Sequence, residues 1–366
     1  MQRSTRVISL VAIGAFAALV LSGCGAAPNA AQTGGATASN FLPCAVSDLT
    51  GFDDHDFNEL TLDGMKAAAS KLGVTPKTAE SASEDQYAGN IAALVGQGCN
   101  LIVTVGFALA TATRDAAKTN PDVNFALIDS AVSNDDFSPL VLPNVKPVLF
   151  DTAQAAALAG YLAAGATKTG FVGTYGGMQF PSVTVFMDGF ADGIDHYNKV
   201  HSTSVKLIGW DKKAQNGLFV GSFSDQLQAK SITSGLLDQN VDIIMPVAGT
   251  LFKSSVEAMI DRGTDGAIIG VNSDAFVSTP QYSKYYLTSV LKNLTTATEE
   301  VTTATAQGKF DNTPYVGTLK NNGVDIAPTH DWKSRLNPAL LGEVDQLKTD
   351  IISGAFVVDS PSSPKR

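Results

Sequence analysis

LIVTVGFALATATRDAAKTNPDVNFALID, residues 101–129, contains the pattern from which the fold class can be predicted. Two apolar runs, Leu101–Val105 and Phe125–Ile128, enclose a helical stretch from Ala108 to Lys118. The helix ends before Asn120-Pro121, because proline cannot continue a helix. Short, continuously apolar strands that alternate with helices are typical of a parallel sheet covered on both faces. This unit therefore predicts the α/β class.

The same alternation extends to both sides of the unit. Upstream, a strand-like run at 42–47 precedes helices near 58–72 and 87–97. Downstream, four more strand–helix repeats are expected, with helices at 153–164, 183–198, 225–237 and 252–261 and strands at 170–173, 205–208, 242–245 and 267–271. A chain of 366 residues is longer than one hydrophobic core usually supports. Two doubly wound lobes are therefore expected.

The composition is that of a globular protein: 44% of residues are hydrophobic, 16% are charged and the formal net charge is −10. Because this charge repels phosphates, we expect no nucleic-acid partner.

Motifs for catalysis or cofactor binding are absent from the sequence. The histidines have no metal-binding spacing; they are His55, His196, His201 and His330. Phosphate-binding glycine loops and the G-x-S-x-G elbow do not occur. The acidic run at 53–56 lacks the glycine and the distal glutamate of a calcium loop. We expect no cofactor, no metal and no enzymatic activity.

The N-terminus has the features of an export signal. Arg3 and Arg6 precede the apolar stretch Val7–Leu21, which is shorter than the roughly 20 residues of a membrane span. The following Leu21-Ser-Gly-Cys24 resembles a bacterial lipobox, which predicts a signal peptide at 1–23 and lipid attachment at Cys24. An ordinary secretory signal is the alternative. Residues 24–40 lack charges and have almost no large apolar residue, so we expect a flexible tether to the outer face of the cell membrane.

Two further cysteines, Cys44 and Cys99, stand at the starts of the strand-like runs 42–47 and 101–105. An exported chain reaches a compartment that permits disulfides. If the two strands are parallel neighbours, both sulfurs lie at one edge of the sheet, and a disulfide is expected. Two independent buried thiols are the alternative.

Polar residues and glycines follow several expected strands, and ligands of open α/β sheets bind beyond these carboxyl ends. The positions are Asp48, Gly106, Asp129, 173–177, Gly249 and 272–274. Asp129 follows an apolar strand, where a charge is costly to bury without a partner. It is interpreted either as a ligand hydrogen-bond acceptor or as a helix N-cap.

Several local strings, taken in order, resemble the basic membrane protein family of lipoproteins, whose better-known members are purine nucleoside receptors of ABC importers. The strings are DLTGFDDHDFN (48–58), VGF (105–107), NFALIDS (124–130), GTYGGM (173–178), MDGF (187–190), GSFSD (221–225), IGVNSD (269–274) and TSVLKN (288–293). The resemblance covers about residues 42 to 357.

The resemblance implies a type I periplasmic-binding-protein-like fold, in which two lobes joined by a hinge close on a ligand. It divides the chain into 41–150 plus 275–312 as lobe 1, and 151–274 plus 313–366 as lobe 2. It also implies an ABC permease as partner, and we expect a monomer.

A purine nucleoside offers a flat base and a vicinal diol. By resemblance, Phe57 and Phe223 would enclose the base, one from each lobe, and Asp129 would accept hydrogen bonds from the ribose hydroxyls. Either phenylalanine could instead be an ordinary core residue.

The resemblance places further ligand contacts at Asp53, Asn58, Gly249, Asn272, Asp274 and Lys292. Asn58 could instead cap the helix that it opens, Lys292 could be a solvated surface residue, and Gly249 could be a turn glycine. Asn272 stands where the family mostly has aspartate. Asparagine both donates and accepts hydrogen bonds, so base preference is open at this position.

Two other functions remain open on the sequence. A sugar or another small polar metabolite could occupy the same cleft, where Asp129 would remain useful but the two phenylalanines would not. A signalling co-receptor would use the same closure to address a protein partner.

Overall fold

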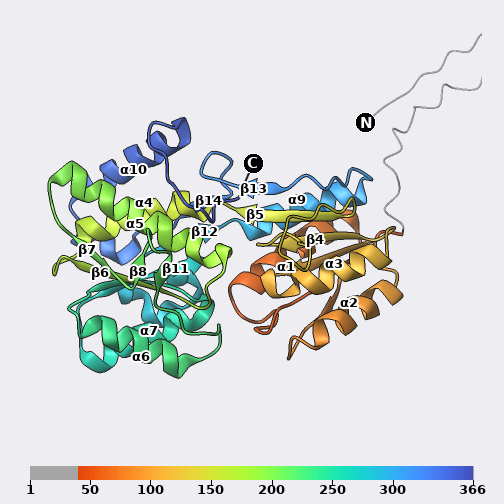
Figure 1. Cartoon of the computed structure of the whole chain (residues 1–366), viewed down its shortest axis with the longest axis horizontal. Coiled ribbons are helices and arrows are strands. Elements are labelled where there is room, and N and C mark those ends of the chain that lie inside the picture. Colours follow the sequence, from red (N-terminus) through yellow and green to blue (C-terminus); the bar gives the residue numbers. More distant parts are fainter. Residues whose placement is uncertain (1–39, 366) are drawn as a thin grey trace, which may run out of the picture. The chain divides into compact units, whose positions relative to one another are not determined.

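Two six-stranded sheets form the framework of residues 40–365, the part of the chain that the computed structural model describes (Figure 1). The expected signal peptide (1–23), nearly all of the tether (24–40) and Cys24 lie outside the described residues. Within residues 40–365, no helix has the length and apolar character needed to cross a bilayer.

The first sheet is parallel throughout, in the order β13-β5-β4-β3-β1-β2. Its strands are β1 (Pro43–Val46), β2 (Lys77–Ala79), β3 (Leu101–Val105), β4 (Asn124–Ile128), β5 (Val145–Phe150) and β13 (Tyr315–Gly317). Neighbouring residues face opposite sides: Ile102 packs with α2 (Gln86–Gly96) and α3 (Ala110–Thr119), and Val103 belongs to the core beneath α1 (Phe57–Leu72) and α9 (Leu294–Ala306). The apolar strands expected from the sequence are thus buried on both faces.

The second sheet has the order β14-β12-β11-β10-β6-β7, with only β14 antiparallel among its described strands. Its strands are β6 (Phe171–Gly176), β7 (Lys206–Ile208), β10 (Ile243–Val247), β11 (Ala267–Asn272), β12 (Tyr286–Lys292) and β14 (Val324–Ile326). Figure 1 shows one face covered by α4 (Thr152–Ala166), α5 (Pro181–His201) and α10 (Pro338–Ser353), and the other by α6 (Gln226–Leu237) and α7 (Phe252–Arg262). A short α8 (Ala275–Ser278) and a small hairpin, β8 (Trp210–Asp211) with β9 (Asn216–Gly217), complete this lobe.

Helices α4 and α5 pack with their backbones in close contact. At Gly193 of α5, a Cβ atom would overlap the carbonyl oxygen of Ala157 in α4. Gly160 of α4 meets the backbone of Phe190 in the same way. Small residues therefore fix the distance between these helices and the position of the second sheet beneath them.

Both sheets share the strand order typical of doubly wound folds: β2-β1-β3-β4-β5 in the first and β7-β6-β10-β11-β12 in the second. The order reverses beside β1 and beside β6, and a crevice opens at such a point beyond the carboxyl ends of the strands. The loops after β1, β3, β6 and β10 are therefore the ones placed to form a site.

The chain passes between the lobes at Asp151, as expected, but the later boundaries differ from those expected. The resemblance places residues 275–292 in lobe 1. They belong to lobe 2, because β12 pairs in parallel with β11, Val290 lying opposite Val271. It places residues 313–317 in lobe 2, but β13 pairs with β5 of the first sheet. The return to lobe 1 therefore comes one strand later, at Asn293.

Cys44 and Cys99 form a disulfide, with their Cα atoms 6.0 Å apart. β1 and β3 are parallel neighbours, with Pro43 opposite Leu101, so both cysteines stand at the strand-start edge of the sheet. The arrangement is the one expected from the sequence, and the alternative of two independent thiols does not hold.

We predict that this disulfide contributes strongly to stability. It closes a loop with a sequence separation of 55 residues, for which the chain-entropy relation gives about 4 kcal/mol. Urea unfolding of the Cys44→Ser/Cys99→Ser variant should show a clearly lower midpoint than that of the oxidised wild type. Reductant should lower the wild-type midpoint and leave that of the double variant unchanged. Equal midpoints for the two oxidised proteins would contradict the prediction.

Candidate functional site

The loop after β1 is organised by Asn58, which is fully buried. Its amide nitrogen donates to Asp48 Oδ1 at 2.9 Å, Thr50 Oγ1 at 2.8 Å and Asp54 Oδ2 at 3.0 Å, and its oxygen accepts the Asp48 N–H at 3.1 Å. Burial raises the pKa of the Asp48 carboxyl above its usual range. The Asn58 side chain is thus engaged in fixing the loop.

The start of α1 is capped by Asp54, not by Asn58. The Asp54 carboxylate accepts the N–H groups of Asp56, Asn58 and Glu59 at 2.9–3.0 Å. The alternative in which Asn58 caps the helix by its side chain is therefore wrong. With Asp54 in this place, α1 begins with Phe57 beside the end of β3, where the Phe57 ring lies against Gly106.

Aromatic side chains from both lobes meet near these strand ends. Phe107 follows Gly106 in lobe 1 and stacks on Phe180 of lobe 2, with ring centroids 3.9 Å apart. Phe223, also of lobe 2, lies 5.9 Å from Phe107 and packs against Gly177. The structure thus places the expected Phe57 and Phe223 at the two sides of one region.

Sequence reasoning missed Phe107 and Phe180. Phe107 directly follows Gly106 after β3, and Phe180 stands three residues after Gly177, the first residue beyond β6. A search for aromatic residues just beyond such glycines would have found them.

An ion pair joins the lobes beside this aromatic group. Lys292, the last residue of β12 in lobe 2, donates to Asp129 Oδ2 of lobe 1, and their side chains are only 3% and 12% exposed. The Lys292 ammonium also lies 4.9 Å from the ring centroid of Phe186 and 5.6 Å from that of Phe57. The alternative of a solvated surface lysine is therefore wrong.

Asp129 has a left-handed backbone, with φ of 60°. No helix starts at this residue in the described chain, since the next regular element is β5, so the N-cap alternative is also wrong. Non-glycine residues with positive φ are uncommon and gather at functional sites.

A second polar pair also crosses between the lobes. Asn272, at the end of β11, donates from Nδ2 to Asp56 Oδ2 at 2.9 Å, and Asp56 is only 2% exposed. Burial raises the pKa of Asp56 from 3.8 to about 7. The nearby donors Asn272 and Ser273 and the charge of Lys292 work against this rise, whereas the charge of Asp54 adds to it. Asp56 Oδ1 is buried and has no hydrogen-bond partner within residues 40–365. Asp56 was not among the residues expected from the sequence.

Two expected residues, Asp274 and Gly249, lie elsewhere at the strand ends. Asp274 caps α8 by accepting the Phe276 N–H at 3.2 Å, and its Oδ2 accepts from His330 Nε2 at 2.7 Å. The His330 ring stacks on Phe276, with centroids 4.0 Å apart, so the Asp274 carboxyl is engaged within lobe 2. Gly249 has φ of 55° with open space where a Cβ would stand, which fits its turn.

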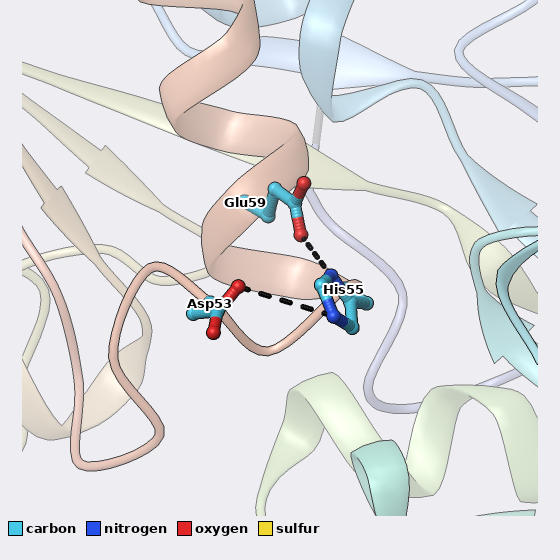
Figure 2. A group of neighbouring side chains, drawn as sticks. All are labelled: Asp53, His55 and Glu59. Carbon is cyan, nitrogen blue, oxygen red and sulfur yellow. Dashed lines mark hydrogen bonds and ion pairs between the residues drawn. The ribbon is translucent and has the colours of Figure 1, made fainter.

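Asp53 lies at the surface, with 97% of its side chain exposed. Figure 2 shows the His55 ring between Asp53 and Glu59, with Nδ1 at 2.8 Å from Glu59 Oε2 and Nε2 at 3.9 Å from Asp53 Oδ1. The two carboxylates face different ring nitrogens, whereas a bound metal needs its ligand atoms to converge on one point. The group is therefore poorly arranged for a metal ion, and the His55 ring bridges the two carboxylates by its two nitrogens.

The comparisons with known proteins agree with this architecture. The sequence matches the Bmp family, described as "ABC transporter substrate-binding protein PnrA-like", over residues 42–358. A relative from Lactococcus lactis, "ABC transporter nucleoside-binding protein BmpA", is 30% identical over 97% of this chain and 99% of its own. "Basic membrane protein A" of Borreliella burgdorferi is 28% identical over 84% of this chain and 85% of its own.

Among solved structures, a solute-binding protein of an Aeropyrum pernix ABC transporter system is similar, with a TM-score of 0.75 and 23% identity over 87% of this chain and 94% of that chain. This similarity shows the two-lobed fold. The family shown by the sequence match consists of solute-binding proteins of ABC transporters, which are not enzymes. The chain therefore belongs to the Bmp family of PnrA-like ABC transporter substrate-binding proteins.

Proposed function

We propose that this substrate-binding protein captures a purine nucleoside between its lobes and delivers it to the permease of an ABC importer. The name of the Lactococcus lactis relative supports a nucleoside as ligand. The observation that carries the proposal is the meeting of aromatic rings and an ion pair from both lobes at the same strand ends.

The aromatic group suits a purine base. Phe57 comes from lobe 1 beside Gly106 and Phe223 from lobe 2 beside Gly177, so each lobe can supply one ring to the base. Aromatic pairs add about 0.5–1.5 kcal/mol beyond the burial of area. Two faces of a flat base can be removed from water in this way only when both lobes contribute.

The ion pair suits a ribose diol. A hydroxyl both donates and accepts, so a vicinal diol can donate to the Asp129 carboxylate and accept from the Lys292 ammonium. A ligand that inserts between these two groups replaces their direct contact without leaving either buried charge unmatched.

We predict that calorimetric titration gives binding of adenosine, guanosine or inosine, and that Phe57→Ala and Phe223→Ala each weaken it at least about tenfold, because each removes one ring face. Asp129→Ala should weaken the binding of nucleosides far more than the binding of free bases, since only nucleosides carry the diol. Phe137→Ala is the matched control: this phenylalanine is 88% exposed, and its loss should leave affinity unchanged.

Binding of ribose or another sugar, with no response to any nucleoside at millimolar concentration, would contradict the proposal. A sugar receptor that uses Asp129 and Lys292 without the aromatic rings would then take its place.

The proposal includes a lipid anchor at Cys24 on the outer face of the cell membrane. The sequence Leu21-Ser-Gly-Cys24 and the polar stretch after it support this. Two acyl chains, at about 0.8 kcal/mol per buried CH₂, are enough for stable anchoring.

We predict that Cys24→Ser moves the protein from the membrane fraction to the soluble fraction in a bacterial host that processes lipoproteins, because serine has no thiol to lipidate. Detergent partition of wild type and variant measures the change, and Thr33→Ser, a conservative change in the expected tether, serves as the control that retains the anchor. An unchanged membrane fraction for Cys24→Ser would contradict the prediction.

A further inference from the structure

We infer that Asp56, oriented by Asn272, selects among ligands by accepting a hydrogen bond from an N–H group of the ligand's base. The inference rests on the proposed function and deepens it, because it states which edge of the base the protein distinguishes. Asp56 stands immediately before Phe57, whose ring is proposed to stack on the base, and is therefore placed to meet the rim of that base.

The first step of the argument is the direction of the Asp56–Asn272 hydrogen bond. Asn272 uses its amide N–H to hold Asp56 Oδ2. An asparagine at this place can donate, whereas an aspartate there would set two carboxylates against each other. The donor from lobe 2 therefore leaves the other oxygen of Asp56, Oδ1, as the free hydrogen-bonding position.

The second step is the state of that oxygen. Asp56 Oδ1 is buried without a partner within the described residues. Leaving a buried acceptor unsatisfied is costly, and more so when it carries charge. A ligand N–H at this oxygen removes the penalty, so closure around a ligand with a donor is favoured over closure around one without.

Ser273 is a neighbouring hydroxyl that could compete for this oxygen. Its Oγ is also buried and also lacks a partner within residues 40–365. The Ser273 hydroxyl lies close enough to Asp56 to oppose the rise of its pKa, yet no hydrogen bond of good geometry joins the two groups within the described residues. A Ser273→Ala variant distinguishes recognition of the ligand by the Asp56 carboxylate from recognition by the Ser273 hydroxyl.

The test compares inosine, which carries N1–H, with purine riboside, which has no N–H on its base. Calorimetric titrations at pH 8 keep Asp56 ionised, since its pKa is about 7. The wild type should bind inosine at least tenfold more tightly than purine riboside. Equal affinities for the two nucleosides overturn the inference and leave the proposed function standing, whereas no binding of any nucleoside overturns both.

A variant of Asp56 can exchange hydrogen-bond acceptor for donor at the side-chain position that Asn272 leaves free. In Asp56→Asn, the Asn272 N–H claims the amide oxygen, so the amide N–H of residue 56 takes the free position and turns an acceptor into a donor. The preference for inosine should fall to onefold or below, because purine riboside offers a ring acceptor at N1. An unchanged inosine preference in this variant would overturn the inference.

The exchange Asp56→Asn/Asn272→Asp restores the original polarity. The carboxylate at 272 now claims the amide N–H of residue 56, so the amide oxygen returns to the free position and the preference for inosine should return. If Asp56→Asn lowers the affinity for both nucleosides equally and the exchange restores it fully, the Asp56–Asn272 pair is a structural contact only, and the inference is overturned. If Asp56→Asn does not fold, as thermal unfolding would show, the wild-type ratio still decides.

Two controls complete the design. Asp63→Asn makes the same chemical change at a half-exposed position of α1 and should leave the ratio unaltered. Ser273→Ala should also leave the preference for inosine over purine riboside unaltered. Loss of this preference in Ser273→Ala would assign recognition of the N–H to the Ser273 hydroxyl and overturn the inference.

Discussion

The buried ion pair between Asp129 and Lys292 is the contact on which the closed arrangement of the lobes depends. Removing two charges from water is expensive, and the cost is recovered only when each charge has a well-placed partner. Asp129 comes from the first sheet and Lys292 from the second, so neither lobe can supply both partners alone. When the lobes are separated, water can solvate the Asp129 carboxylate and the Lys292 ammonium. When the lobes are closed, the two groups must either pair directly or both contact a ligand.

The second pair repeats this division of chemistry between the lobes. In both pairs the acceptor carboxylate comes from lobe 1, as Asp129 and Asp56, and the donor comes from lobe 2, as Lys292 and Asn272. A ligand lying between the lobes must therefore present donors toward one side and acceptors toward the other. A hydroxyl does both with a single atom, which is why a diol is a better match than a carboxylate, whose charge would repel lobe 1.

The backbone holds both sides of the site in the same unusual way. Asp129 directly follows the parallel strand β4 and Asn272 is the last residue of the parallel strand β11, and both have left-handed φ values, 60° and 66°. Such strain costs about 1–3 kcal/mol per residue and persists only where surrounding structure imposes it. Here both residues stand at the carboxyl ends of largely buried strands, and each contributes one polar side chain to a contact between the lobes.

These features also explain how far the sequence could be interpreted. The strand Leu101–Val105 is the one expected, because a short apolar run bounded by glycine leaves little choice, and Asp129, Asn272 and Lys292 could be expected since they end such runs. The assignment of 286–292 failed, because a buried strand suits either sheet equally and only its pairing with β11 decides. Within the polar run 53–56, no periodicity distinguishes the exposed Asp53 from the buried Asp56; that depends on how Asn58 and Asp54 fix the loop.

Stacking and polar matching contribute differently to the choice of ligand. The rings of Phe107 and Phe180 already contact each other across the lobes, so a base that displaces this contact gains only the difference between ring–base and ring–ring packing. Every base has a π-face, so stacking separates bases from sugars but hardly one base from another. The Asp56 carboxylate, by contrast, changes from unsatisfied to satisfied with a single N–H. For the purine nucleoside that we propose as ligand, discrimination among bases would therefore fall to Asp56 and Asn272, and the aromatic residues would determine only that the ligand carries a base.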